Sequence, residues 1–191
     1  MRIIYSGKKI YLRALETNDL EIIMKGWNNW GIRRYLSNLF PNSKLSEENW
    51  LKNATLADPW KDGRIHFAIE NKSHEFIGTC GYFNINIKDR RAELGIAIHS
   101  DDNLGKGYGT DALIVLLWVA FHIMNFHSIY LKVIDFNKRA IRAYEKTGFK
   151  KAGMYREAIF VEGSYHDLLT MDILRNEYNS RYPPGSYVHE K

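Results

Sequence analysis

Hydrophobic and polar residues alternate along this chain with two periods, which predict a mixed α/β fold. A period of two indicates half-buried strands, and apolar residues spaced three or four apart indicate amphipathic helices. We expect strands at residues 9–14, 65–70, 76–84, 92–99, 128–134, 150–160 and 164–174. We expect helices at residues 17–28, 31–38, 46–57, 108–124 and 138–147. The pattern predicts a mixed sheet of about seven mostly antiparallel strands, flanked by helices, with one strand–helix–strand crossover around the helix at 108–124.

Capping and breaking residues mark several boundaries. Thr17 is a suitable N-cap for the first helix, and Ser46 starts the third, which Pro59 is expected to break. Gly148 is expected to end the helix at 138–147, because glycine accepts the left-handed conformation found there. Turns or polar connections are expected at residues 71–74, 88–91 and 162–163, and the tail at 175–191 is expected to be either ordered or loose.

A glycine-rich segment follows the strand at 92–99 and precedes the most apolar helix. Its residues are Leu104, Gly105, Lys106, Gly107, Tyr108, Gly109 and Thr110. Alternate glycines allow tight turns and close approach of backbone N–H groups to a ligand, and the helix N-terminus that follows favours an anion. The spacing fits neither the Walker loop nor the dinucleotide-binding loop. The segment alone leaves two interpretations open, a phosphate cradle and a plain tight turn.

The strand before this loop has two unlike faces. Leu94, Ile96 and Ile98 lie on one face and alternate with Glu93, Gly95 and Ala97 on the other. The first set forms a bulky apolar face. The small residues of the second set are expected to leave room for a ligand.

Composition excludes several classes of protein. The chain has 191 residues, of which 45% are hydrophobic and 26% charged, as in a globular protein of one domain. The longest apolar run, residues 112–121, is too short to cross a bilayer, and charges throughout residues 1–20 argue against a signal peptide. We therefore expect a single domain at 1–191 and a cytoplasmic location.

Net charge and the spacing of possible metal ligands further limit the classes of ligand that we expect. The net charge of +5 suits either a nucleic acid or a ligand with several phosphates. The basic residues are scattered, which argues against a nucleic acid partner. Cys80 is the single cysteine and is expected to be a buried structural thiol. The seven histidines form no metal-ligand spacing, so we assign no metal.

A second motif gives the loop a context. Asn137, Ala140, Tyr144, Gly148 and Phe149 match the pattern Asn-x-x-Ala-x-x-x-Tyr-x-x-x-Gly-Phe. Together with the loop, this motif resembles the GNAT family of N-acetyltransferases. Leu104 departs from the Arg or Gln that the family has at that position. The wider pattern resembles the RimJ/RimL-like branch from about residue 10 to 174, including its Arg-Glu … Gly-x-x-x-Asp ending at residues 156–167.

The resemblance implies a cosubstrate and its site. Acetyl-CoA would bind with its pyrophosphate on the backbone N–H groups of residues 105–110, and Lys106 could add charge. Its pantetheine arm would pair with the backbone of Ile96, Ala97 and Ile98, where an N–H group would also meet the oxyanion. Asn137 would hydrogen-bond the coenzyme, cap the helix that follows, or do both.

The resemblance also implies two catalytic residues and direct attack by an amine. Tyr144 would donate a proton to the leaving sulfur; the alternative is a core tyrosine on an amphipathic helix. Glu93 would be the general base; the alternatives are an exposed carboxylate and a salt bridge with Arg90 or Arg91. In this family the early helices line the acceptor site, so Trp27, Trp30, Tyr35 and Trp60 are candidates for its pocket, with core packing as the alternative for each.

The acceptor amine stays open at this stage. Our preferred hypothesis is a protein or peptide N-terminal amine, as for ribosomal proteins, and the alternative is a polyamine, diamine or other small amine. A polyamine site needs clustered carboxylates, for which the candidates are Glu93, Glu157, Glu162 and Asp167. A third hypothesis is a CoA-binding or ribosome-associated module without catalysis. The resemblance also allows a homodimer formed through the late strands.

Overall fold

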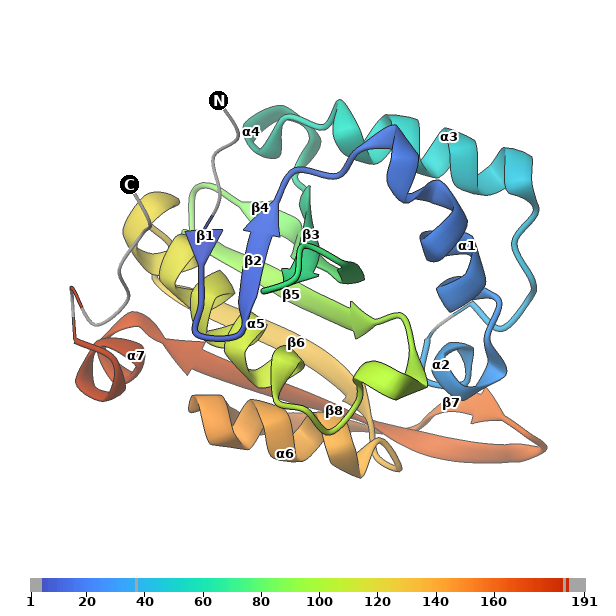
Figure 1. The fold of residues 1–191 in the computed structure, drawn as a ribbon. Coiled ribbons are helices and arrows are strands. Elements are labelled where there is room, and N and C mark those ends of the chain that lie inside the picture. The colour runs from blue at the N-terminus through green and yellow to red at the C-terminus, as the bar shows by residue number, and fades with distance from the viewer. Residues whose placement is uncertain (1–4, 37, 184, 186–191) are drawn as a thin grey trace.

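The computed structural model describes residues 5–36, 38–183 and 185, and its strands form one sheet (Figure 1). The strand order is β1-β2-β3-β4-β5-β6-β8-β7. The strands are β1 (Tyr5–Ser6), β2 (Ile10–Arg13), β3 (Ile65–Asn71), β4 (Phe76–Asn86), β5 (Arg91–Ile98), β6 (Ser128–Ile134), β7 (Lys150–Val161) and β8 (Ser164–Leu174). The mixed α/β prediction is confirmed. The sheet has eight strands rather than about seven, because β1 is too short to show an alternating pattern.

The helices lie between the strands in the expected order. They are α1 (Leu20–Trp27), α2 (Trp30–Arg33), α3 (Lys44–Thr55), α4 (Pro59–Asp62), α5 (Tyr108–Trp118), α6 (Lys138–Thr147) and α7 (Arg175–Arg181), with 3-10 turns η1 (Thr17–Asp19) and η2 (Asp101–Asn103) and a π-helical turn η3 (Val119–Ile123) that extends α5. All adjacent strands pair antiparallel except β5 and β6, which are parallel and joined through α5. This is the expected crossover.

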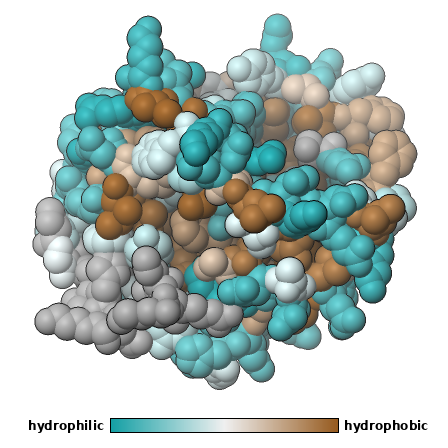
Figure 2. All heavy atoms as spheres, turned by 90° about the horizontal axis from the view of Figure 1, so that it is seen from above, coloured by the Kyte–Doolittle hydropathy of each residue, from teal (hydrophilic) through white to brown (hydrophobic). Residues whose placement is uncertain are grey.

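Two hydrophobic clusters cover opposite faces of the sheet. Phe67 and Ile69 of β3 pack into the larger cluster with α5 and α6, whereas Ala68 between them packs into the smaller one with α1 and α3. The alternation follows from the pleat, which points successive side chains to opposite faces. Seen from above, over α1 and α3, the surface is mostly hydrophilic with hydrophobic residues interspersed (Figure 2).

Several helix starts differ from the sequence prediction. Thr17 is not an N-cap, because Glu16 and Asp19 form a reciprocal capping box around the 3-10 turn. The third helix begins at Lys44, since Ser43 rather than Ser46 supplies the capping oxygen. Pro59 does interrupt the chain after α3, and it also occupies the first turn of the short helix α4.

The predicted helix at 31–38 is shorter than expected, and the tail is partly helical. Helix α2 ends at Arg33, and residue 37 lies outside the described residues. Helix α7 is anchored by Tyr178, which is fully buried and donates its hydroxyl to the carbonyl of Ile114 at 3.0 Å. The tail is therefore ordered as far as this helix.

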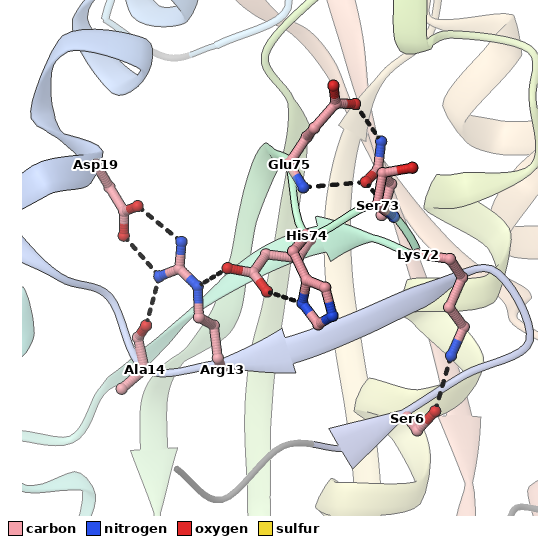
Figure 3. Close-up of polar contacts among 10 residues, drawn as sticks. Ser6, Arg13, Ala14, Asp19, Lys72, Ser73, His74 and Glu75 are labelled. Atoms are coloured by element: carbon pink, nitrogen blue, oxygen red, sulfur yellow. Dashed lines mark hydrogen bonds and ion pairs between the residues drawn. The ribbon is translucent and has the colours of Figure 1, made fainter. Parts of the chain in front are cut away.

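A buried ionic cluster fixes α1 to the sheet (Figure 3). The guanidinium of Arg13 donates two hydrogen bonds to the Asp19 carboxylate, at 2.8 and 2.7 Å, and a third to Glu70. All three side chains are buried. The fork geometry of arginine matches a carboxylate, so this cluster sets the entry of the chain into η1 and α1.

A buried histidine connects the smaller cluster to the end of β5. His99 is 4% exposed, packs against Trp27 and Gly26 of α1, and pairs through Nε2 with the hydroxyl of Thr79 at 3.1 Å. Burial lowers the pKa of His99 to about 4. The folded protein therefore holds this imidazole neutral at pH values where the unfolded chain protonates it.

This shift predicts a pH-dependent stability. As the pH falls from 6.5 to 4, the unfolded state takes up a proton that folded His99 does not, so the free energy of unfolding should fall by about 3 kcal/mol from this residue. Urea unfolding at several pH values measures it. A His99→Gln variant should show a shallower dependence, and variant His127→Gln, at an exposed histidine, should match the parent. Equal slopes in parent and His99→Gln would contradict the assignment.

Candidate functional site

Strands β5 and β6 pair only at their beginnings and then separate. Their register pairs Arg91 with Ser128, Ala92 with Ile129, and ends at Glu93, opposite Tyr130. Beyond this point β6 continues beside β8, and β5 continues beside β4. In the described part of the chain no strand pairs with the other edge of β5 after Glu93. The sheet therefore has an open wedge at its centre.

The free edge of β5 offers backbone groups to a ligand. The N–H of His99 donates to Ile77 on the β4 side, at 2.9 Å. Because successive residues of a strand direct their backbone groups to opposite edges, the N–H groups of Ile96 and Ile98 point into the wedge and that of Ala97 points to β4. An extended ligand with amide groups can pair with such an edge as an added strand.

The glycine loop lies at the wide end of the wedge. Gly105 and Gly107 have φ angles of +74° and +85°, which only glycine adopts at low cost. Leu104 is extended between η2 and the loop, and Gly105, Lys106 and Gly107 are exposed. Helix α5 begins at Tyr108, and no side chain caps the N–H groups of its first turn. The loop and the first-turn N–H groups of Gly109 and Thr110 thus provide anion-binding geometry.

Tyr144 lies on the α5 and α6 side of the sheet. It is 7% exposed and belongs to the same buried cluster as Leu94 of β5 and Ile129 of β6, with its ring edge-on to Phe149. Burial raises the pKa of Tyr144 to about 12. Burial alone causes this shift, and no hydrogen bond of the hydroxyl contributes to it. The phenol is therefore protonated at neutral pH and available as a donor.

Asn137 is confirmed as the cap of α6. Its side-chain oxygen accepts from the N–H of Ala140 at 3.2 Å. The cap fixes the start of the helix that carries Tyr144, and Gly148 ends that helix with a φ of +107°. These two boundaries agree with the sequence prediction.

Glu93 lies on the opposite face of the sheet from Tyr144. Its neighbours Ala92 and Leu94 belong to the α5 cluster, so the Glu93 side chain points toward α1 and α3. It accepts from the amide of Asn84 at 2.9 Å and forms an ion pair with Lys132 at 3.5 Å. A salt bridge was the expected alternative, but its partner is Lys132 and not Arg90 or Arg91. Glu93 is also the residue at which the wedge begins.

The face of β5 that carries Glu93 is less open than expected. A Cβ at Gly95 would lie 2.7 Å from the ring of Phe83, which projects from the neighbouring strand β4. Gly95 thus makes room for a phenyl ring and not for a ligand. The free space at β5 is at its edge.

A hollow of about 440 Å³ lies beyond the end of β6. It is lined by Arg34, Tyr35, Phe136, Val161, Glu162, Ser164 and His166. These residues come from the segment after α2, from the β6–α6 connection and from the β7–β8 hairpin. The two residues of the hairpin turn, Glu162 and Gly163, both have positive φ, as a tight two-residue turn requires, and the turn agrees with the prediction.

Aromatic rings and charged groups meet in this hollow. The ring of Phe136 packs against Tyr35 and His166, with centroids 5.5 and 4.6 Å apart. The guanidinium of Arg34 lies over the rings of Phe136 and Tyr35, at 5.4 and 5.8 Å, and forms an ion pair with Glu162 at 2.7 Å. The hollow therefore already holds a cation between a carboxylate and two ring faces.

The aromatic residues that were candidates for the acceptor pocket lie in different places. Tyr35 lines the hollow, and Trp30 donates its indole N–H to Glu162 at 3.0 Å. Trp27 packs against His99, and Trp60 borders a separate, smaller hollow with Phe126. Phe136 and His166 escaped the sequence analysis, because only the folded chain brings the β6–α6 connection and the last hairpin together.

The described residues bear on the predictions about a metal, a membrane and Cys80. Among them, no group of histidine, cysteine and carboxylate side chains is arranged to hold a metal ion. No described helix is long and apolar enough to cross a membrane. Cys80 is buried, and burial raises the pKa of its thiol, which suits a structural residue.

The fold and the wedge are those of an acyltransferase that binds an extended thioester, and comparison with known proteins gives the family. Residues 9–150 match the family model described as an acetyltransferase (GNAT) domain. The chain belongs to the GNAT acetyltransferases. It is an acetyl-CoA-dependent N-acetyltransferase, and acetyl-CoA is its cosubstrate. The alternative of a module without catalysis is not supported.

The similar proteins include polyamine acetyltransferases. The chain is 33% identical to spermidine N(1)-acetyltransferase of Vibrio cholerae over 92% of this chain and 98% of that protein. It is 30% identical to the Escherichia coli K12 enzyme of that name over 94% of each chain. A crystal structure of the V. cholerae enzyme in complex with CoA and spermine superposes with a TM-score of 0.80, at 31% identity, covering 88% of this chain and 97% of that one.

These relatives support the family but leave the RimJ/RimL-like branch unconfirmed. A putative ribosomal N-acetyltransferase of Bacillus subtilis is 28% identical over 53% of this chain, a shorter match than those to the spermidine enzymes.

The departure from the family motif at Leu104 has a structural explanation. The loop presents backbone groups to a ligand, and Leu104 itself is partly buried in an extended conformation.

The glycine loop gives a stability prediction. Gly107→Ala forces a side chain into a left-handed conformation and places its Cβ 3.3 Å from the Lys9 ammonium, so the free energy of unfolding should fall by about 1 to 2 kcal/mol. Gly109→Ala is the matched control. Its Cβ would make only an ordinary contact with Ile98, at 3.9 Å, in a regular helical turn. Denaturant unfolding compares the two, and equal losses would contradict the role of the Gly107 conformation.

Proposed function

We propose that this enzyme transfers the acetyl group of acetyl-CoA to a primary amine of a polyamine such as spermidine. Two spermidine N(1)-acetyltransferases align with the chain over more than nine-tenths of its length, at 33% and 30% identity. They favour the polyamine alternative over the protein N-terminal amine that the sequence analysis preferred. The observation in this chain that carries the proposal is the hollow that holds a cation between Glu162 and two aromatic rings.

The chemistry of the hollow suits a flexible chain with several ammonium groups. Carboxylates and ring faces both attract an ammonium ion. Glu162 lies at one side, and Asp135, 3.5 Å from Nδ1 of His166, lies behind another. Arg34 now fills the position of a cation, and a substrate ammonium can replace it or share Glu162 with it. Of the four carboxylates considered from the sequence, only Glu162 lines the hollow.

The hollow lies near the open end of the wedge between β5 and β6. The α1–α2 connection contacts the segment after β5, where the amide of Asn29 lies 3.5 Å from Asp101. The start of α2 contacts the β7–β8 hairpin, where Trp30 bonds Glu162. These contacts therefore span the open end between the two strands. An amine bound there enters from the side of the sheet that faces α1, whereas the pantetheine arm lies along β5.

Within this proposal, Glu93 and Tyr144 act from opposite faces of the wedge. Glu93 takes the proton of the attacking ammonium, through water, and the free amine attacks the thioester carbonyl. The N–H groups of Ile96 and Ile98 are the donors nearest to the developing oxyanion, and Ala97 between them contributes to the strand and not to the oxyanion. Tyr144 gives its proton to the departing thiolate. Attack forms the C–N bond and a tetrahedral oxyanion, and collapse of this adduct breaks the C–S bond. The second proton of the nitrogen leaves to water, solvent restores the Tyr144 phenol, and no covalent enzyme intermediate is required.

Location and assembly stay predictions within this proposal. A cytoplasmic location follows from the expectations set by the sequence. A homodimer would use β7, an edge strand, whose exposed side chains include Met154, Tyr155 and Phe160. An exposed edge with apolar side chains is a surface that a second strand can cover. Sedimentation at several concentrations measures the assembly.

Substitution of Glu162 tests the acceptor site. Glu162→Gln removes the counter-charge and leaves Arg34 unpaired in the hollow, so KM for spermidine should rise about 10-fold with kcat within about 3-fold. Glu157→Gln, at an exposed residue of β7 outside the hollow, is the control and should leave KM unchanged. The assay follows thiol release from acetyl-CoA with spermidine and with Ser- and Ala-starting peptides. Turnover of peptides but not of spermidine would sink the polyamine proposal.

Substitution of Tyr144 tests the proton donor. Tyr144→Phe keeps the ring in its cluster and removes only the hydroxyl, so kcat should fall by about 100-fold while the melting temperature and KM for acetyl-CoA stay near those of the parent. Because burial raises the pKa of Tyr144 to about 12, its acid role should persist to at least pH 10. An unchanged kcat in Tyr144→Phe would show that the hydroxyl has no part in the reaction.

A further inference from the structure

A lysine far from the glycine loop in sequence lies against it in the structure. Lys9 belongs to the turn between β1 and β2, and its Nζ donates to the backbone carbonyl of Lys106 at 2.7 Å. The same ammonium lies 3.3 Å from the point where a Cβ on Gly107 would stand. The glycine loop therefore has beside it the ammonium group of a residue near the N-terminus of the chain.

One buried carboxylate fixes the turn that carries Lys9. Asp111, in the first turn of α5, accepts backbone N–H bonds from Lys8 at 3.2 Å, from Lys9 at 2.7 Å and from Ile10 at 3.2 Å. Gly7 leaves no room for a side chain, since a Cβ there would lie 2.3 Å from the Asp111 carboxylate. Hydrogen bonds to a charged acceptor are strong, so they hold the backbone at Lys9 against the first turn of α5.

The Lys9 ammonium has donors to spare. An ammonium group carries three, and the Lys106 carbonyl takes one. Lys9 and Lys106 are both exposed, and no carboxylate among the described residues forms an ion pair with either of them. Two like charges beside a loop of free N–H groups attract an anion with several negative charges.

We propose that Lys9 binds a phosphate group of acetyl-CoA together with the glycine loop. The N–H groups of the loop and of the first turn of α5 hold the anion, and Lys9 adds a charge-assisted hydrogen bond from outside the motif. Lys9 thereby becomes part of the cosubstrate site, and the turn at residues 7–10 holds it in position. The proposal rests on acetyl-CoA as cosubstrate and is independent of which amine is acetylated.

Binding measured by calorimetry, without any acceptor, tests the proposal. The probes are CoA, 3′-dephospho-CoA and pantetheine, which lacks phosphate. Lys9→Met should weaken CoA binding by about 10-fold and leave pantetheine binding unchanged. Lys8→Met is the matched control, because it removes the same charge from the same turn, and it should change CoA binding by less than about 2-fold. A loss that persists with 3′-dephospho-CoA assigns Lys9 to the diphosphate, and one that disappears assigns it to the 3′-phosphate.

A second variant separates charge from structure. Lys9→Gln can still donate to the Lys106 carbonyl but carries no charge, so it should weaken CoA binding as Lys9→Met does. CoA binding equal to that of the parent in Lys9→Gln, or equal losses for CoA and pantetheine in Lys9→Met, would overturn the proposal and make Lys9 a structural residue. Because no amine is present, failure of the polyamine proposal would leave this result unaffected.

Discussion

The separation of β5 from β6 after Glu93 is the constraint on which the rest of the site depends. A strand in the middle of a sheet ordinarily spends its backbone groups on two neighbours. Here β8 holds β6 along its whole length and β4 holds β5, so the central pair can part without loss to either flank. The unpaired edge of β5 lies in the middle of the sheet and is half-buried, and in our proposal the extended thioester arm pairs with it. The fold thus leaves one strand position open, which our proposal assigns to the cosubstrate.

The two ends of this wedge carry different chemistry. Glu93, at its apex, faces α1 and α3, whereas Tyr144 lies on the α5 and α6 side, so the proposed base and the proposed acid lie on opposite faces of the sheet. At its wide end the glycine loop offers backbone donors to phosphate, and the hollow around Phe136 offers ring faces and Glu162 to a cation. A negatively charged cosubstrate and a positively charged acceptor can therefore enter the same wedge at separate surfaces.

Local patterns predicted the elements, and tertiary contacts decided the site. Period-two alternation located seven strands, and the cap at Asn137 and the turn at Gly148 were readable because each depends on its own neighbours in sequence. The position at which β5 leaves β6, the ring of Phe83 over Gly95, and the approach of Lys9 to Lys106 depend on residues far apart in the chain. A hydrophobic pattern indicates which face of a strand is buried, but it does not indicate how far two strands stay paired.

Amide hydrogen exchange tests the wedge most directly. In peptides that cover residues 94–99 and 105–111, the N–H groups without a partner among the described residues should exchange fast in the absence of ligand, whereas those bonded to β4, such as that of His99, should exchange slowly. Saturating CoA should slow exchange in both peptides, and pantetheine should slow it only in the first, because it lacks the phosphates that the loop binds. Unchanged exchange at 94–99 with CoA bound, together with protection elsewhere in the sheet, would show that the coenzyme arm does not lie along β5.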